Sequence, residues 1–276
     1  MKKTLIAVLI FLVLIISSGF VSKTETVLED NGDFNLYFCP QDNCETNFLN
    51  FLNSAEESIH CALFEVGLNS VKDKLLEKSK QMDVKVVIDD RYSFNQPFVK
   101  KDKWGLMHNK FCIIDGKKIS TGSMNPTNNG VNKNNNNLLL LESKTLAKNY
   151  ETEFQELWNE EFKGGLPTNV PEFLFNNVSV KNYFCPEDYC ADKIKTELKK
   201  AEVSIHFMTF SFTHEGIANM LLLKHLDGIQ IKGVMEARQV SKYSQYNRLK
   251  YNGLDVVKDQ NKQNMHHNVL RIATIL

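Results

Sequence analysis

The sequence lacks an excess of charge of either sign. Its 276 residues include 33 Lys and Arg against 33 Asp and Glu, so the formal net charge near neutral pH is zero. A neutral chain has no long-range field to attract nucleic acid or an anionic membrane, so any polyanion must be held by local contacts. Hydrophobic residues make up 42% of the chain, which is enough to bury a core in one large domain or two small ones.

Long apolar runs are also scarce, and the one that occurs lies at the N-terminus. Residues 1–22 begin with Lys2 and Lys3, continue with an apolar run over 5–16, and then reach Ser17, Ser18 and Gly19. This layout predicts a secretory signal peptide. An uncleaved membrane anchor is the alternative, because the apolar stretch is almost long enough to span a bilayer. In both cases we expect an exported protein, either secreted or anchored to the outer face of the cytoplasmic membrane.

The chain contains an internal repeat. The pattern Y-F-C-P-x-D-x-C occurs at 37–44 and again at 183–190, and the same shift aligns S-I-H at 58–60 with S-I-H at 204–206. Gly and Pro residues between 164 and 171 are typical of a connecting segment. We therefore predict a first lobe over 34–163, a linker over 164–177 and a related second lobe over 178–276.

Hydrophobic periodicity predicts alternating strands and helices in both lobes, which indicates an α/β fold with a mixed sheet flanked by helices. In the first lobe we expect strands near 37–39, 58–64, 84–89, 111–115 and 138–142, and helices near 45–55, 70–80 and 143–162. In the second lobe we expect strands near 183–185, 204–210 and 229–236, and helices near 191–201 and 215–225. The second lobe has no counterpart of the last strand and helix of the first, so we expect it to be incomplete.

Six cysteines occur, and four of them belong to the repeated pairs Cys39 with Cys44 and Cys185 with Cys190. In an exported protein, disulfides are the leading interpretation, with local pairing as the simplest connectivity and pairing between lobes left open. A four-cysteine zinc site is the alternative, although the spacing is wider than is usual for such sites. Cys61 and Cys112 lie in apolar strands, where we expect small buried hydrophobic side chains. The remaining candidate residues form one motif.

That motif starts at His108 and continues with Lys110, Asp115 and the run G-S-M-N at 122–125. It resembles the signature of the phospholipase D superfamily, H-x-K, four residues, D, six residues, G-S-x-N, and every fixed position is filled. Six matched positions coincide by chance only about once in 10⁸ windows. The resemblance covers most of the chain, from about 35 to 267, although its specific motif lies only between 108 and 125.

The residue types explain a metal-free chemistry. Residues two apart on a strand share a face, so His108 and Lys110 are expected to point into one site. A neutral imidazole is a competent nucleophile for phosphorus, while Lys110 offers a positive charge to a phosphate oxygen. Ser123 and Asn125 add hydrogen-bond donors for the substrate. We therefore expect no metal and no cofactor, and the resemblance implies a transient phosphohistidine on His108.

Two further residues have less certain roles. Asp115 belongs to the superfamily motif and is a candidate catalytic residue, but it precedes Gly116 in a typical turn pair, so we weigh a supporting structural role above direct catalysis. Many relatives place a carboxylate after the motif to hold the other nitrogen of the histidine. Here that segment reads N-N-N-N at 134–137, and Asn136 is the expected substitute, with weaker stabilisation of an imidazolium.

The second copy of the motif is broken. Met265 and His266 align with Met107 and His108, which makes His266 the candidate general acid, but Asn268 stands where the Lys is expected and no G-S-x-N follows. We consider three explanations. The reading frame or gene end is faulty, or the protein borrows a second His108 by forming a homodimer, or it is catalytically dead and only binds phosphate.

Two functions from different classes follow. The first is an exported phosphodiesterase acting on DNA, RNA or phospholipid, and the short lobes favour a nuclease or general phosphodiesterase over a phospholipase. The second is a phosphate- or anion-binding module that has lost catalysis. Hydrolysis of an activated phosphodiester that persists in EDTA and disappears in His108→Ala discriminates between them.

Overall fold

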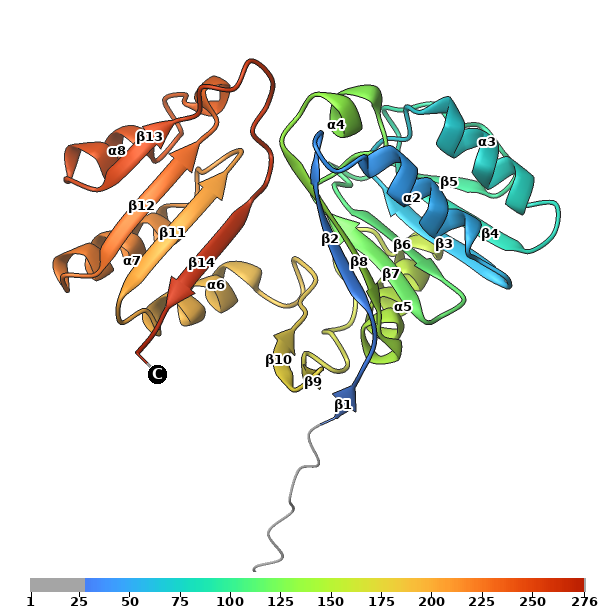
Figure 1. Cartoon of the computed structure of the whole chain (residues 1–276), viewed down its shortest axis with the longest axis horizontal. Helices are drawn as coiled ribbons and strands as arrows, with labels where there is room; N and C mark the ends of the chain where they lie inside the picture. The colour runs from blue at the N-terminus through green and yellow to red at the C-terminus, as the bar shows by residue number, and fades with distance from the viewer. Residues whose placement is uncertain (1–27, 276) are drawn as a thin grey trace, which may run out of the picture.

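The computed structural model describes residues 28–275, which form two α/β lobes side by side (Figure 1). The predicted signal peptide or anchor at 1–22 lies outside the described residues. Within 28–275, no helix has both the length and the apolar character needed to cross a bilayer. The α/β class with mixed sheets flanked by helices is confirmed.

The first lobe is built on a seven-stranded mixed sheet. The three strands at one end of the sheet, 58–63, 83–89 and 99–102, run parallel. The first two are mostly buried because both faces of the sheet are covered by helices. One hydrophobic cluster, which includes Phe48 and Leu75, lies on one face of the sheet. A second cluster, which includes Phe111 and Phe154, lies on the other face. The strands in sheet order are β2 (Phe34–Cys39), β8 (Asn136–Glu142), β7 (Lys118–Gly122), β6 (Lys110–Ile114), β3 (Ser58–Leu63), β4 (Asp83–Asp89) and β5 (Val99–Asp102), and the helices are α2 (Cys44–Asn53), α3 (Asn69–Lys78), α4 (Asn128–Asn132) and α5 (Lys144–Trp158).

The second lobe repeats part of this plan with a four-stranded sheet. Its strand β14 runs antiparallel to β11, as β6 runs antiparallel to β3 in the first lobe. The strands in sheet order are β13 (Asp255–Lys258), β12 (Gln230–Met235), β11 (Ser204–Thr209) and β14 (Val269–Ala273), and the helices are α6 (Cys190–Lys199), α7 (Glu215–Leu226), η1 (Ala237–Gln239) and α8 (Tyr246–Tyr251).

The strand predicted at 183–185 is wrong. In the first lobe the same sequence pattern lies in β2, which bonds along its length to β8. The described part of the second sheet has no counterpart of β8, so the backbone at 183–185 has no neighbour to pair with and is irregular.

The segment predicted as a linker, 164–177, also contains structure. Residues Glu172–Phe175 form β9, which pairs with β10 (Val178–Lys181) and with β1 (Glu29–Asp30) in a small third sheet. Phe173 and Phe175 are buried in the core cluster that includes α5. These two aromatic side chains hold β9 against the first lobe.

All six cysteines form disulfides. The local pairs Cys39–Cys44 and Cys185–Cys190 follow the simplest predicted connectivity, so no free thiolates remain for the zinc alternative. The prediction for Cys61 and Cys112 is wrong: both are fully buried, but they are joined to each other. They face each other across β3 and β6, a contact that sequence spacing does not reveal.

Candidate active site

The predicted histidines meet in a cavity of about 460 Å³. His108 lies two residues before Lys110, which begins β6, while His266 lies just before β14 in the other lobe. The centroids of the two imidazole rings are 6.2 Å apart, and the ring planes stand at 81°. The cavity is lined by Leu36, His108, Lys110, Thr121, Gly122, Ser123, Asn137, Leu139, His266, His267 and Asn268.

Lys110 governs the charge of this cavity. Its Nζ donates a hydrogen bond to the carbonyl oxygen of His108 at 2.8 Å and lies 5.1 Å from the ring centroid of Phe64. Desolvation lowers the pKa of Lys110 to about 7. An anionic phosphate beside the ammonium would raise that pKa again, because an opposite charge favours the protonated form.

His108 is held in the state that a nucleophile needs. Desolvation, followed by the charge of Lys110 and then by His266, lowers the pKa of His108 to about 4. The ring packs edge-on against Phe64, with centroids 4.9 Å apart. At neutral pH the imidazole is therefore uncharged and keeps a lone pair on a ring nitrogen.

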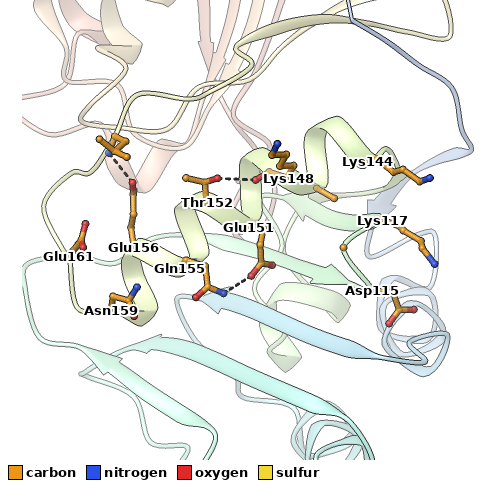
Figure 2. Close-up of a pocket in the computed structure, with 13 residues that line it drawn as sticks. Asp115, Lys117, Lys144, Lys148, Glu151, Thr152, Gln155, Glu156, Asn159 and Glu161 are labelled. Atoms are coloured by element: carbon orange, nitrogen blue, oxygen red, sulfur yellow. Dashed lines mark hydrogen bonds between the residues drawn. The ribbon is translucent and has the colours of Figure 1, made fainter.

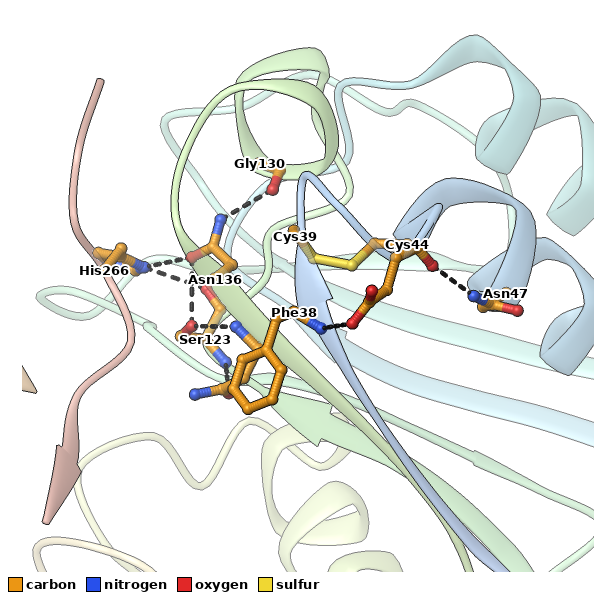
Figure 3. The surroundings of a disulfide bond; sticks show 10 residues. Phe38, Cys39, Cys44, Asn47, Ser123, Gly130, Asn136 and His266 are labelled. Atoms are coloured by element: carbon orange, nitrogen blue, oxygen red, sulfur yellow. Dashed lines mark hydrogen bonds between the residues drawn. A yellow bond between two sulfur atoms is a disulfide. The ribbon is translucent and has the colours of Figure 1, made fainter. Parts of the chain in front are cut away.

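His266 is fixed by two acceptors from the first lobe. Its Nδ1 lies 2.9 Å from Oδ1 of Asn136 and 3.1 Å from the carbonyl oxygen of Ser123 (Figure 3). Both partners accept, so Nδ1 carries hydrogen and Nε2 is the nitrogen left to exchange a proton. Desolvation, followed by the charge of Lys110, lowers the pKa of His266.

The two residues predicted to bind substrate beside the histidines differ in position. Ser123 lines the cavity, but its hydroxyl donates to Oδ1 of Asn136 at 3.2 Å and accepts from the backbone of Asn137 at 3.0 Å. Asn125 is not among the lining residues, and its Oδ1 is buried without a hydrogen-bond partner. Ser123 therefore lines the cavity, whereas Asn125 does not.

Asp115 is outside the cavity. It occupies the turn after β6, where its carboxylate accepts hydrogen bonds from the backbone amides of Glu56, Glu57 and Ser58 at 2.7–3.1 Å. These bonds fix the start of β3 against the end of β6. The geometry supports the structural role of Asp115 and not direct catalysis.

The chain is similar in sequence to known proteins. Residues 91–158 match the family model described as "Cardiolipin synthase, PLD-like domain". The mitochondrial cardiolipin hydrolase of Chlamydomonas reinhardtii is 28% identical over 142 residues, which cover 44% of this chain and 64% of that protein. The phospholipase D of Rickettsia prowazekii is 30% identical over 127 residues, which cover 41% of this chain and 62% of that protein.

The chain belongs to the phospholipase D superfamily. It spans less than two thirds of the length of these two relatives. In fold it is similar to the phosphatidylserine synthase of Haemophilus influenzae, with a TM-score of 0.61 at 10% identity, over 87% of this chain and 76% of that chain.

In this phospholipase D superfamily member, Asn136 contacts a different histidine from the one expected. The expected partner is His108, but the Oδ1 of Asn136 accepts a hydrogen bond from His266 of the opposite lobe. Its orientation is fixed because Nδ2 donates to the carbonyl oxygen of Gly130 at 2.8 Å. The error arose because a single sequence does not reveal which lobe a loop faces.

The Asn run at 134–137 is the joint that docks the second histidine loop. The backbone amide of Asn135 donates to the carbonyl oxygen of Asn264, and its carbonyl oxygen accepts from the amide of His266, both at 2.9 Å. Asn137 Nδ2 donates to the carbonyl oxygen of His267, also at 2.9 Å. The role of this run in joining the lobes was not predicted from the sequence.

Asn268, which replaces the expected second Lys, also lines the cavity. Its Oδ1 accepts a hydrogen bond from the backbone amide of Phe210 at 2.8 Å. The side chain is therefore engaged with β11 and supplies no positive charge. Of the two motif positions for Lys, only Lys110 is cationic in this superfamily member.

Two other features flank this cavity, and the second of them, a carboxylate cluster, lines a neighbouring cavity of about 310 Å³ together with His108. A hollow of about 770 Å³ runs along α5, with Lys117, Lys144 and Lys148 at its rim (Figure 2), and neither histidine lines it. Glu153 and Glu187 form a carboxylate cluster with Glu156. Burial, with Glu187 next, raises the pKa of Glu153 to about 8.

Proposed function

We propose that this protein hydrolyses phosphodiesters through a covalent intermediate on His108. The single observation that carries the proposal is the pair of imidazoles, 6.2 Å apart across one cavity, with Lys110 beside them. Nucleophilic catalysis by histidine needs one neutral imidazole to attack and one protonated imidazole to release the leaving group.

The reaction proceeds in two balanced steps. A ring nitrogen of His108 forms a bond to phosphorus as the P–O bond to the leaving group breaks, and His266 gives its proton to the departing oxygen. His266 then takes a proton from water, the water oxygen bonds to phosphorus, and the P–N bond to His108 breaks. Lys110 holds a non-bridging phosphate oxygen throughout and stabilises its developing charge.

For the substrate class we propose a lipid phosphodiester ahead of nucleic acid. The matched relatives carry the names cardiolipin hydrolase and phospholipase D. Leu36 and Leu139 form an apolar part of the cavity wall, and the chain has no net positive charge to hold a polynucleotide. Release of head group from vesicles containing cardiolipin or phosphatidylglycerol, compared with cleavage of single-stranded DNA, tests this choice.

The test of the activity is hydrolysis of bis-p-nitrophenyl phosphate. We expect turnover that persists in EDTA, is lost in His108→Ala, and is unchanged in His225→Ala, a matched variant on α7 outside the cavity. After reaction with a ³²P-labelled diester and an alkaline quench, protein-bound ³²P that is stable in alkali and labile in acid reports the intermediate. Turnover by His108→Ala at the wild-type rate would contradict the proposal.

The alternative is an anion-binding protein without turnover, and the uncharged Asn268 at the second Lys position favours it. In that case inorganic phosphate would bind with an affinity that falls in Lys110→Ala, while no diester would be hydrolysed. The second imidazole, His266, is supplied by the same chain, so the proposed reaction requires no homodimer. A homodimer remains a separate prediction, tested by sedimentation.

We also propose export, with membrane association if residues 1–22 stay attached. The three disulfides among the described residues support an oxidising compartment. Fractionation of cells that express a C-terminally tagged chain, with carbonate extraction of the membrane pellet, distinguishes secreted protein from anchored protein.

A further inference from the structure

Each lobe contains a buried carboxylate that accepts a hydrogen bond from the backbone amide of the residue before its site histidine. Asp89 ends β4, and its Oδ2 accepts a hydrogen bond from the backbone amide of Met107 at 3.1 Å. Glu236 follows β12, and its Oε2 accepts from the backbone amide of Met265 at 2.7 Å. Both carboxylates are buried, with exposed fractions of 0% and 2%.

Each carboxylate is also held by an arginine two residues further along. Nε and Nη2 of Arg91 donate to the two oxygens of Asp89 at 2.6 and 2.7 Å. The backbone amide of Arg238 donates to Oε1 of Glu236 at 3.0 Å, and its Nη1 lies 3.5 Å from the same oxygen. A buried carboxylate bonded on both oxygens has one orientation.

The residue after each Met is a site histidine. A backbone amide bonded to a fixed anion cannot shift without losing a charge-assisted bond in a buried place. Fixing the amide of Met107 therefore limits where the ring of His108 can point, and fixing Met265 does the same for His266. Both Met side chains are buried, at 4% and 3% exposed, so packing also holds the backbone that leads to each histidine.

We propose that Asp89 and Glu236 are paired positioning residues, Asp89 for the attacking imidazole and Glu236 for the proton-donating imidazole. The pairing rests on the proposed function, which gives the two histidines different tasks. Because the tasks differ, loss of each carboxylate must impair a different part of the reaction. A purely structural role would affect both parts alike.

The test compares Asp89→Asn and Glu236→Gln on two substrates. The side chain of each variant has one acceptor oxygen instead of two. The donors of the Met and of the Arg must then compete for that single oxygen. Bis-p-nitrophenyl phosphate has a leaving group that needs no proton, whereas phosphatidylglycerol in mixed micelles has an alkoxide that does. We expect Glu236→Gln to lower the single-turnover rate of leaving-group release about 10–100-fold on the lipid and less than about threefold on the activated diester, in the range seen when orienting partners are removed. Asp89→Asn should lower kcat on both by about 10–100-fold.

Asp102→Asn is the matched control. Asp102 is a buried carboxylate at the end of the adjacent strand β5, and it accepts a backbone hydrogen bond from Trp104 at 2.7 Å, but that bond leads to neither histidine. Asp102→Asn should lower stability without any difference between the two substrates. The charge-preserving variants Asp89→Glu and Glu236→Asp should recover part of the lost kcat.

A second measurement needs no turnover. In ¹⁵N spectra of the histidine side chains, Asp89→Asn should move the resonances of His108 and leave those of His266, and Glu236→Gln should do the reverse. Equal losses on both substrates for Glu236→Gln, or spectra in which neither ring responds, would overturn the inference. If the wild-type protein is inactive, or insensitive to His108→Ala, the proposed function fails, while the spectra still decide whether the two carboxylates position the rings.

Discussion

Asn136 of the first lobe and His266 of the second are joined by a hydrogen bond of 2.9 Å from Nδ1 to Oδ1. An amide oxygen orients the ring as a carboxylate would, but it brings no negative charge to stabilise the imidazolium. Desolvation and Lys110 therefore lower the pKa of His266 without an opposing anion.

Replacing Asn136 with Asp should restore that charge. We expect the pKa of His266 to rise, so that the alkaline limb of kcat/KM moves up by about one pH unit or more. Asn136→Ala should instead lower kcat about 10–100-fold, because the ring loses an orienting partner. Asn134→Asp is the control, since Asn134 contacts the backbone of Asn264 and no imidazole. An alkaline limb that stays in place in Asn136→Asp would contradict this account.

The wild-type protein should work best below neutral pH. Activity should rise as His108 loses its proton near its pKa of about 4, because only the neutral ring attacks phosphorus. It should fall as His266 loses its proton below the ordinary 6.5, and as Lys110 loses its own near a pKa of about 7. Bound phosphate raises both of the latter pKa values, so the alkaline limb of kcat should lie above that of kcat/KM.

Profiles from pH 3 to 9 measure these limbs. Lys110→Arg keeps the charge and does not titrate in this range, so any remaining alkaline limb belongs to His266. A limb of kcat/KM that falls only above pH 8 would show that neither lowered pKa governs turnover.

His60 should make stability depend on pH. Its Nδ1 lies 2.8 Å from Glu151 and its Nε2 lies 3.2 Å from Asp83. Burial opposes the charged ring, but the two carboxylates, Glu151 first, outweigh it and raise the pKa of His60 above 6.5. A raised folded-state pKa means that the stabilisation is complete below pH 6.5 and is lost as pH rises through the folded value.

Urea unfolding between pH 5.5 and 9 tests this dependence. The free energy of unfolding of His60→Gln should be about 1–3 kcal/mol lower than that of the wild type at pH 6, with a smaller difference at pH 9. A difference that grows with pH would reverse the sign and contradict the assignment.

The Cys61–Cys112 disulfide should contribute more stability than the local ones. It links residues 51 apart in sequence, against 5 for Cys185–Cys190. Loop-closure entropy predicts losses of about 4 and about 2 kcal/mol when each pair is replaced by Ala. Thermal unfolding of the two double variants measures the difference, and equal shifts in Tm would argue against the entropic account.

Local patterns predicted the parts of the site that lie close together in sequence. Two-residue spacing placed His108 and Lys110 in one cavity, and the repeat pointed to His266 as its second imidazole. The partner of Asn136 and the Cys61–Cys112 bond could not be predicted, because both depend on contacts between segments far apart in the chain. The strand expected at 183–185 failed for a related reason, since a strand forms only where a neighbouring strand supplies hydrogen bonds.

Because each lobe contributes one imidazole, turnover in this protein would also depend on the distance between the two lobes. A change in the Asn134–Asn137 joint that lets the lobes separate would abolish turnover while both sheets stay folded. Rate measurements would thus detect a loosened joint that spectroscopic probes of secondary structure would overlook.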